Sequence, residues 1–160
     1  LGPLNFDFSA ERDGGLPRLR LNPYSWTQFA NVLFLDLPVG TGFSYGKTAE
    51  STYSTTSQSC HQAYAFLRKW LDDHGEFVSS PFYVAGDSYS GLMIPVIAQI
   101  IADGNEDGIK PQINLKGYIM GNGLTFKGEE NYRVPFAHGL GIIPDELYAV
   151  ECLKSLKKYI

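Results

Sequence analysis

The chain has 160 residues, of which 44% are hydrophobic and 19% are charged. This composition is typical of a globular protein with a core, and it excludes an intrinsically disordered chain. The formal net charge of -4 argues against a nucleic-acid partner, because phosphate binding needs a basic surface. No apolar stretch reaches the roughly 20 residues of a membrane-spanning helix, so no membrane partner is expected.

The first half of the chain predicts one strand and one helix. Glycine and proline interrupt residues 1–30, which we expect to be irregular. The apolar run Val32-Leu33-Phe34-Leu35 predicts a buried parallel strand within residues 31–37, followed by a glycine-rich loop. One face of an amphipathic helix, which Gly75 helps to end, is predicted by the spacing of Ala63, Phe66, Leu67, Trp70 and Leu71.

The second half alternates strands with helices. Residues 82–85 predict a strand, and an apolar helix follows, in which Pro95 either bends the helix or confines its regular part. Residues 113–120 predict a further strand, and a last helix is expected to start near Pro144. This alternation predicts an α/β fold with a parallel sheet.

The most informative segment is Gly86-Asp87-Ser88-Tyr89-Ser90-Gly91, between a predicted strand and a predicted helix. It matches the nucleophile-elbow pattern G-x-S-x-G loosely, because Ser90 stands at the second glycine position and Gly91 comes one residue later. The pattern predicts Ser88 as a nucleophile, with the helix N-terminus facing the charge that develops during attack on a carbonyl. The alternative interpretation is that these small residues serve only strand–helix packing.

Several segments resemble the serine carboxypeptidase family, and its plant serine carboxypeptidase-like branch above all. They follow the family's order along nearly the whole chain: residues 22–26, 31–36, 38–45, 66–71, 81–91, 113–118, 134–141 and 145–148. The resemblance implies a partial α/β-hydrolase fold, with a parallel sheet core and a nucleophile elbow. It implies one incomplete domain over residues 1–160, in which residues from about 125 to 160 begin a helical insertion.

The resemblance implies serine-type hydrolysis of C-terminal peptide bonds through an acyl-enzyme at Ser88. The backbone N–H of Tyr89 would be one oxyanion-hole donor, and Asp87 would bind the terminal carboxylate of the peptide, at a position where carboxypeptidases usually carry glutamate. One alternative is an acyltransferase that uses acyl-glucose donors. Asp87 and Ser90 look more like the residues of the acyltransferase members of the family. The substrate is thus a peptide or an acyl ester.

A second alternative is a catalytically silent fragment. In the family the triad aspartate and histidine lie beyond the position of Ile160, and a Gly-Gly-Pro-Gly segment with the second oxyanion donor lies before Leu1. His61 and His74 precede Ser88, against the chain order of this fold, and His138 is interpreted as a structural histidine. The chain is therefore expected to be inactive alone.

No cofactor or metal is expected, because Cys60 beside His61 is not a zinc motif, which needs three or four ligands. The sequence leaves the disulfide state of Cys60 and Cys152 open. Localisation follows by resemblance only, and it points to the secretory route, the vacuole or the extracellular space.

Overall fold

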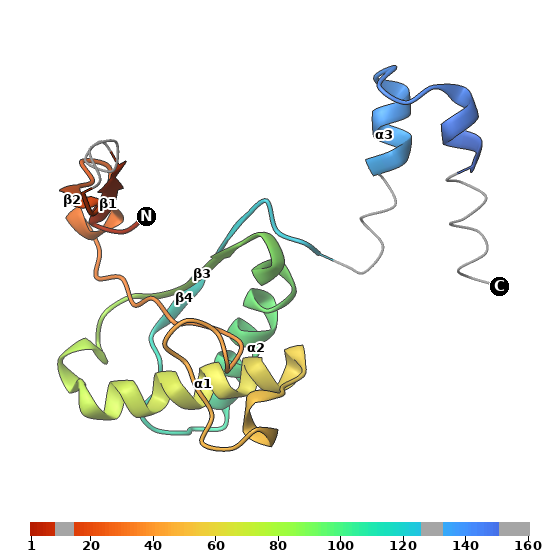
Figure 1. Cartoon of the computed structure of the whole chain (residues 1–160). Coiled ribbons are helices and arrows are strands. Elements are labelled where there is room, and N and C mark those ends of the chain that lie inside the picture. Colours follow the sequence, from red (N-terminus) through yellow and green to blue (C-terminus); the bar gives the residue numbers. More distant parts are fainter. Residues whose placement is uncertain (9–14, 126–132, 151–160) are drawn as a thin grey trace. The chain divides into compact units, whose positions relative to one another are not determined.

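The computed structural model describes residues 1–8, 15–125 and 133–150. The chain divides into two compact units, Leu1–Asp36 and Leu37–Ile160, and each unit is described by itself (Figure 1). The expectation of one incomplete domain over residues 1–160 stays a prediction.

The first unit contains an antiparallel hairpin. Strand β1 (Leu4–Asp7) pairs with strand β2 (Arg18–Leu21), with Leu4 opposite Leu21 and Phe6 opposite Leu19. The prediction that residues 1–30 are irregular is therefore wrong here. The missed signal is a strict alternation of apolar and polar residues in both short segments, which is the period of a strand.

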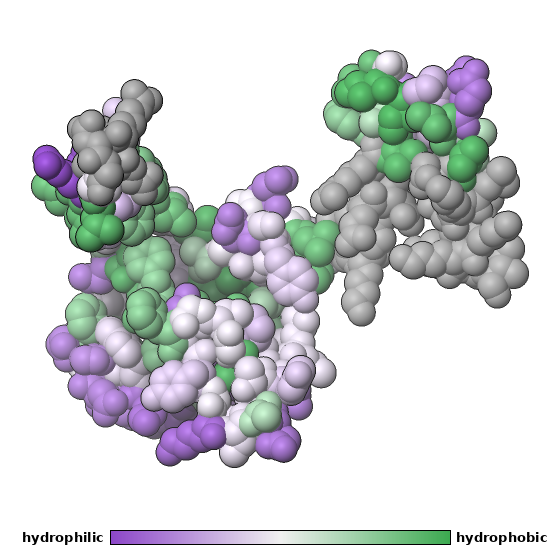
Figure 2. Space-filling view, in the orientation of Figure 1, coloured by the Kyte–Doolittle hydropathy of each residue, from purple (hydrophilic) through white to green (hydrophobic). Residues whose placement is uncertain are grey.

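The hairpin has one apolar face. Because Leu4, Phe6, Leu19 and Leu21 occupy alternate positions, they lie on the same face, and each is at least half exposed. Figure 2 shows green apolar surface on this part of the chain. Two strands alone are at best marginally stable in water, so further contacts are needed to hold the hairpin.

A polar turn after β2 supplies such contacts. The Asn22 amide donates to the carbonyl of Gly2 at 2.9 Å, and the Ser25 hydroxyl donates to the carbonyl of Leu1 at 3.1 Å. Ser25 is only 3% exposed and also caps a 3₁₀ helix, η2 (Trp26–Gln28). The turn thus ties the N-terminal residues to the end of the hairpin.

The strand predicted over residues 31–37 is not formed, since the structure is irregular there. A strand needs a neighbour to pair its backbone groups, and the two sheets of the described residues are the β1–β2 and β3–β4 pairs. Leu33 and Phe34 are 41% and 59% exposed, so the apolar run also lacks the burial expected of it.

The second unit is built on two parallel strands. Strand β3 (Phe82–Asp87) pairs with β4 (Leu115–Gly121), with Asp87 beside Gly121 at their carboxyl ends. Helix α2 (Ile94–Glu106) connects the strands and packs on both of them. This arrangement confirms the predicted α/β class with a parallel sheet. β3 continues two residues further than predicted, and β4 begins two residues later and ends one residue later than predicted.

Helix α1 (Thr56–Asp73) packs against α2 and completes the core (Figure 1). The predicted amphipathic face is confirmed: Ala63, Leu67 and Leu71 are buried. Pro95 lies in the first turn of α2, so it limits where the helix begins and does not bend it. The core side chains are Cys60, Ala63, Leu67, Leu71, Val84, Met93, Ile94, Ile97, Ala98, Ile101 and Ile113.

Short 3₁₀ helices flank α1 and follow β3: η3 (Glu50–Thr52), η4 (Gly75–Phe77) and η5 (Ser88–Leu92). Helix α3 (Arg133–Gly139) precedes a helix that covers residues 145–150, which confirms the predicted start near Pro144. None of the described helices combines the length and apolar character needed to cross a bilayer.

The Ile101→Ala substitution tests whether α1 and α2 share a packed core. The Ile101 side chain is 0% exposed, so Ile101→Ala should lower the free energy of unfolding by about 2–5 kcal/mol, as lost transfer energy plus a cavity. Urea unfolding followed by circular dichroism measures this loss. The matched control is Val96→Ala on the same helix, where the side chain is 41% exposed, and equal losses in the two variants would contradict this core.

Cys60 is a free thiol that is 0% exposed in α1, and burial raises the pKa of this thiol. Because the thiolate is the reactive form, iodoacetamide should modify Cys60 at least about tenfold more slowly in the native chain than in urea. Mass spectrometry of the peptide that carries Cys60 gives this rate separately from that of Cys152. Equal rates in the two conditions would contradict the burial of Cys60 in this core.

Candidate active site

Ser88 lies where β3 ends and the turn into η5 begins. Its backbone φ is 55°, in the left-handed region that non-glycine residues rarely adopt, and the residue is exposed. Such backbone strain costs on the order of 1–3 kcal/mol and persists only where the surroundings enforce it. The strand, the strained serine and the following helix have the geometry of a nucleophile elbow.

Two glycines permit this turn. A Cβ on Gly86 would lie 2.6 Å from the Cβ of Ser90, and one on Gly91 would lie 2.5 Å from the carbonyl oxygen of Leu124. Both distances are shorter than real side chains tolerate. Ser90 faces Gly86 and so can carry a Cβ, whereas Gly91 cannot. The close approach of the loop after β4 therefore explains why the second glycine stands one residue later than in G-x-S-x-G.

The loop after β4 is hydrogen-bonded to the backbone of Ser88. The N–H of Leu124 donates to the carbonyl of Ser88 at 2.8 Å. Asn122, which begins this loop, has a φ of 43°, a second strained position beside the first. Because parallel strands present their carboxyl ends at one edge, Ser88 and this loop share the edge at which α/β folds bind ligands.

Tyr89 lies in the first turn of η5, where backbone amides have no acceptor within the helix. This position makes its N–H available to an oxyanion formed at Ser88. The Tyr89 hydroxyl lies 3.2 Å from the hydroxyl of Thr56, at the start of α1. The side chain of Tyr89 thus extends from the turn to a neighbouring helix.

Asp87 is the last residue of β3 and is exposed. It lies beside Gly121, where a Cβ would meet the Cβ of Asp87 at 3.4 Å. The carboxylate is therefore carried by a paired strand, one residue from Ser88. A carboxyl group in this position can hydrogen bond to a substrate that enters the edge.

The three histidines are engaged elsewhere. A ring nitrogen of His61 lies 2.9 Å from the Ser57 carbonyl within α1, and the ring of His74 contacts that of Trp70 in a tilted arrangement at the end of the same helix. The Nε2 atom of His138 lies 2.7 Å from an oxygen of Asp145, and the ring stacks on a tyrosine at 4.0 Å. This pairing agrees with the structural role predicted for His138. Sequence reasoning had not identified its aspartate partner.

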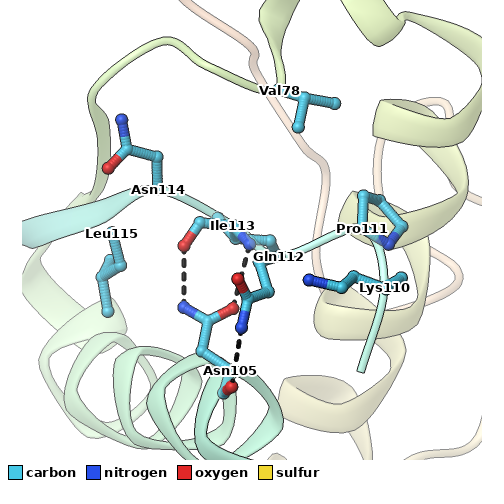
Figure 3. Close-up of a pocket in the computed structure, with 8 residues that line it drawn as sticks. All are labelled: Val78, Asn105, Lys110, Pro111, Gln112, Ile113, Asn114 and Leu115. Carbon is cyan, nitrogen blue, oxygen red and sulfur yellow. Dashed lines mark hydrogen bonds between the residues drawn. The ribbon is translucent and has the colours of Figure 1, made fainter. Parts of the chain in front are cut away.

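A hollow at the other end of the strands is lined mainly by the loop at residues 110–114, which joins α2 to β4 (Figure 3). The Asn105 amide donates to the Ile113 carbonyl at 2.7 Å, and its carbonyl accepts from the Ile113 N–H at 3.0 Å. Six strand residues separate this end of the sheet from Ser88, roughly 20 Å at the usual rise. Asn105 therefore holds this loop in place at a point remote from Ser88.

Within residues 1–8, 15–125 and 133–150, no three His, Cys, Asp or Glu side chains gather into a group that could hold a metal ion. The polar groups at the carboxyl ends of the strands include the Ser88 hydroxyl, the Tyr89 amide and the Asp87 carboxylate. The structure brings these three together on consecutive residues at the end of β3.

Known proteins share this arrangement of segments. Serine carboxypeptidase-like 19 of Arabidopsis thaliana is 51% identical over 92% of this chain and 32% of its own length. Serine carboxypeptidase-like 2 of the same plant is 48% identical over 98% of this chain and 34% of its own length. The chain thus spans about a third of the length of the curated relatives that it matches.

The fold has a solved counterpart. The crystal structure of a prohormone-processing carboxypeptidase from Saccharomyces cerevisiae aligns with a TM-score of 0.69 and 27% identity, over 90% of this chain and 30% of that one. This similarity confirms the partial α/β-hydrolase fold. The family model for serine carboxypeptidases matches residues 1–158, and on this evidence the chain belongs to the serine carboxypeptidase family.

Proposed function

We propose that Ser88 is the acyl-accepting nucleophile of a serine-type carboxypeptidase, which removes C-terminal residues from peptides. The observation that carries this proposal is the exposed Ser88 at a strained turn, bonded through its own carbonyl to Leu124. A hydroxyl in this setting is presented to a substrate by the backbone, and rotation of a flexible side chain is not needed to expose it.

The reaction divides into two acyl-transfer steps. The Ser88 Oγ bonds to the scissile carbonyl carbon, its proton passes to a base, and the carbonyl electron pair moves to oxygen, where the Tyr89 N–H stabilises it. The carbon–nitrogen bond then breaks and the leaving amine takes the proton. Water attacks the acyl-enzyme in the same way, which releases the acid and restores the serine.

Asp87 is proposed to bind the terminal carboxylate of the peptide. Two carboxyl groups share a hydrogen bond only when one of them is protonated, so this contact favours acidic conditions. Acidic conditions accord with the secretory route, the vacuole or the extracellular space, which we propose as the location of the protein. The location rests on the family alone.

The second candidate is acyl transfer from glucose esters to an alcohol. It shares every step up to the acyl-enzyme and differs only in the acceptor, which is an alcohol in place of water. The specific observation in its favour is the aspartate at position 87, which resembles the acyltransferase members of the family. A peptide or an acyl ester is accordingly the proposed substrate.

We further propose that these 160 residues alone do not turn over substrate efficiently. Among the described residues, the contacts of His61, His74 and His138 are with Ser57, Trp70 and Asp145 and none is with Ser88, so none of the three is assigned as its base. The triad histidine and aspartate would then belong to further polypeptide of the same protein. The competing third reading is a chain that has lost catalysis altogether.

The first test is labelling of Ser88 by a fluorophosphonate probe. Loss of a triad histidine costs up to about a million-fold in rate, so the 160-residue chain should label at least about 1000-fold more slowly than a complete serine carboxypeptidase. Residual labelling should vanish in Ser88→Ala and persist in Ser90→Ala, the control in the same turn. Labelling of the chain at the rate of a complete enzyme, lost in Ser88→Ala, would refute the proposed inactivity.

The second test separates the two substrates in the complete polypeptide that carries this segment. Asp87→Ala should raise KM for a blocked dipeptide with a free carboxylate about tenfold or more, because one charge-assisted hydrogen bond is lost. Asp87→Asn, which still donates, should change KM less, and the amidated dipeptide serves as the control substrate.

Steady-state assays with the dipeptide and with an acyl-glucose donor measure this difference. Release of a C-terminal amino acid at acidic pH counts against the acyltransferase. Transfer from the acyl-glucose donor without such release, and with no effect of Asp87→Ala on KM for peptides, would replace the peptidase proposal by the second candidate.

A further inference from the structure

The first two turns of α1 make one contact with the elbow and one with the residue that follows η5. The hydroxyls of Thr56 and Tyr89 lie 3.2 Å apart, and the thiol of Cys60 lies 3.8 Å from the carbonyl oxygen of Met93, which follows η5. Thr56 and Cys60 are four residues apart, so they occupy the same face of the helix. One side of the α1 N-terminus is thus directed at the turn that carries Ser88.

The α1 N-terminus is held in place independently of the elbow. The Thr55 hydroxyl accepts from the Gln58 N–H at 3.2 Å, and the Gln58 side chain accepts from the Thr55 N–H at 2.8 Å, which forms a complete capping box. Ser59 is 2% exposed, and its hydroxyl lies 2.9 Å from that of Ser54. These hydrogen bonds therefore hold the backbone of Thr56 in place without the contact to Tyr89.

The Tyr89 ring, in contrast, is not held by burial. Its residue is 57% exposed, so packing alone leaves the side chain free to move. The contact with Thr56 restricts the far end of the ring, while the bond from Leu124 to the Ser88 carbonyl restricts the backbone just before it. The peptide unit between Ser88 and Tyr89 is thereby fixed from both sides.

We propose that Thr56 is a positioning residue, which acts through the Tyr89 hydroxyl to hold the Tyr89 N–H toward the oxyanion formed at Ser88. The inference rests on the proposed acyl chemistry and extends it to a residue on another helix. Oxyanion donors act because they are oriented before charge develops. An N–H group whose orientation fluctuates therefore stabilises the transition state less, while substrate binding is unchanged. Thr56 touches no reacting atom, and its effect is carried by one hydroxyl pair.

The test compares Thr56→Val, Tyr89→Phe and the double variant in the complete polypeptide that carries this segment. Each change deletes one hydroxyl and keeps the shape of the side chain. With an ester substrate, each single variant should lower kcat about three- to tenfold at unchanged KM, as expected for one net hydrogen bond. The double variant should be no slower than either single variant, because both remove the same contact.

Two controls address a merely structural role. Thr56→Ser retains the hydroxyl and should restore kcat to within about twofold, and Ser57→Ala, an exposed hydroxyl deletion one residue further along α1, should leave kcat unchanged. A drop of kcat in Ser57→Ala, additive losses in the double variant, or a change confined to KM would overturn the inference.

Backbone ¹⁵N relaxation in the 160-residue chain tests the same contact without catalysis. The order parameter of the Tyr89 N–H should be lower in Thr56→Val than in wild type or Thr56→Ser, with the order parameters of the core amides of α2 unchanged. If Ser88 of the complete polypeptide fails to label above Ser88→Ala, the proposed chemistry fails. An unaltered order parameter at Tyr89 would overturn the role of Thr56 whatever the labelling shows.

Discussion

The hydrogen bond from the Leu124 N–H to the Ser88 carbonyl is the contact on which the candidate site depends. It joins the ends of two parallel strands at the residue whose backbone is strained. A positive φ at a serine is unfavourable by itself, and it persists because this bond and the close passage over Gly91 leave the turn little alternative. The loop after β4 is thus as much a part of the elbow as the elbow sequence.

The core behind the turn supplies the stabilisation that the strain requires. Ile94, Ile97 and Ile101 follow Ser88 along α2 and are almost completely buried. Each such side chain contributes on the order of 1.5–3 kcal/mol when it leaves water, so the three together outweigh the cost of one strained residue. α1 packs against α2 and brings Thr56 to the elbow, so two helices support the turn that carries the exposed Ser88.

The first unit is organised by different forces. Its hairpin leaves Leu4, Phe6, Leu19 and Leu21 on an exposed face, so burial contributes little to holding it. Polar contacts of Asn22 and Ser25 with the carbonyls of the first residues take that role. The segment Asn22-Pro23-Tyr24-Ser25 therefore has a structural explanation in this chain, independent of any catalytic one.

The sequence by itself determined the elements whose signal is local. The 3.6-residue spacing of Ala63, Leu67 and Leu71 identified the buried face of α1, and the small residues around Ser88 identified the elbow. The local pattern failed where strand pairing decides whether a strand forms. The hairpin of β1 and β2 was missed, and the apolar run at residues 32–35 forms no strand. The reason is that a strand is stable only beside a partner strand. Only the tertiary structure showed why position 91 must be glycine, that the Leu124 N–H donates to the Ser88 carbonyl, and that the hydroxyls of Thr56 and Tyr89 meet. These contacts join residues that are 33 or more positions apart, so no short-range pattern in the sequence encodes them.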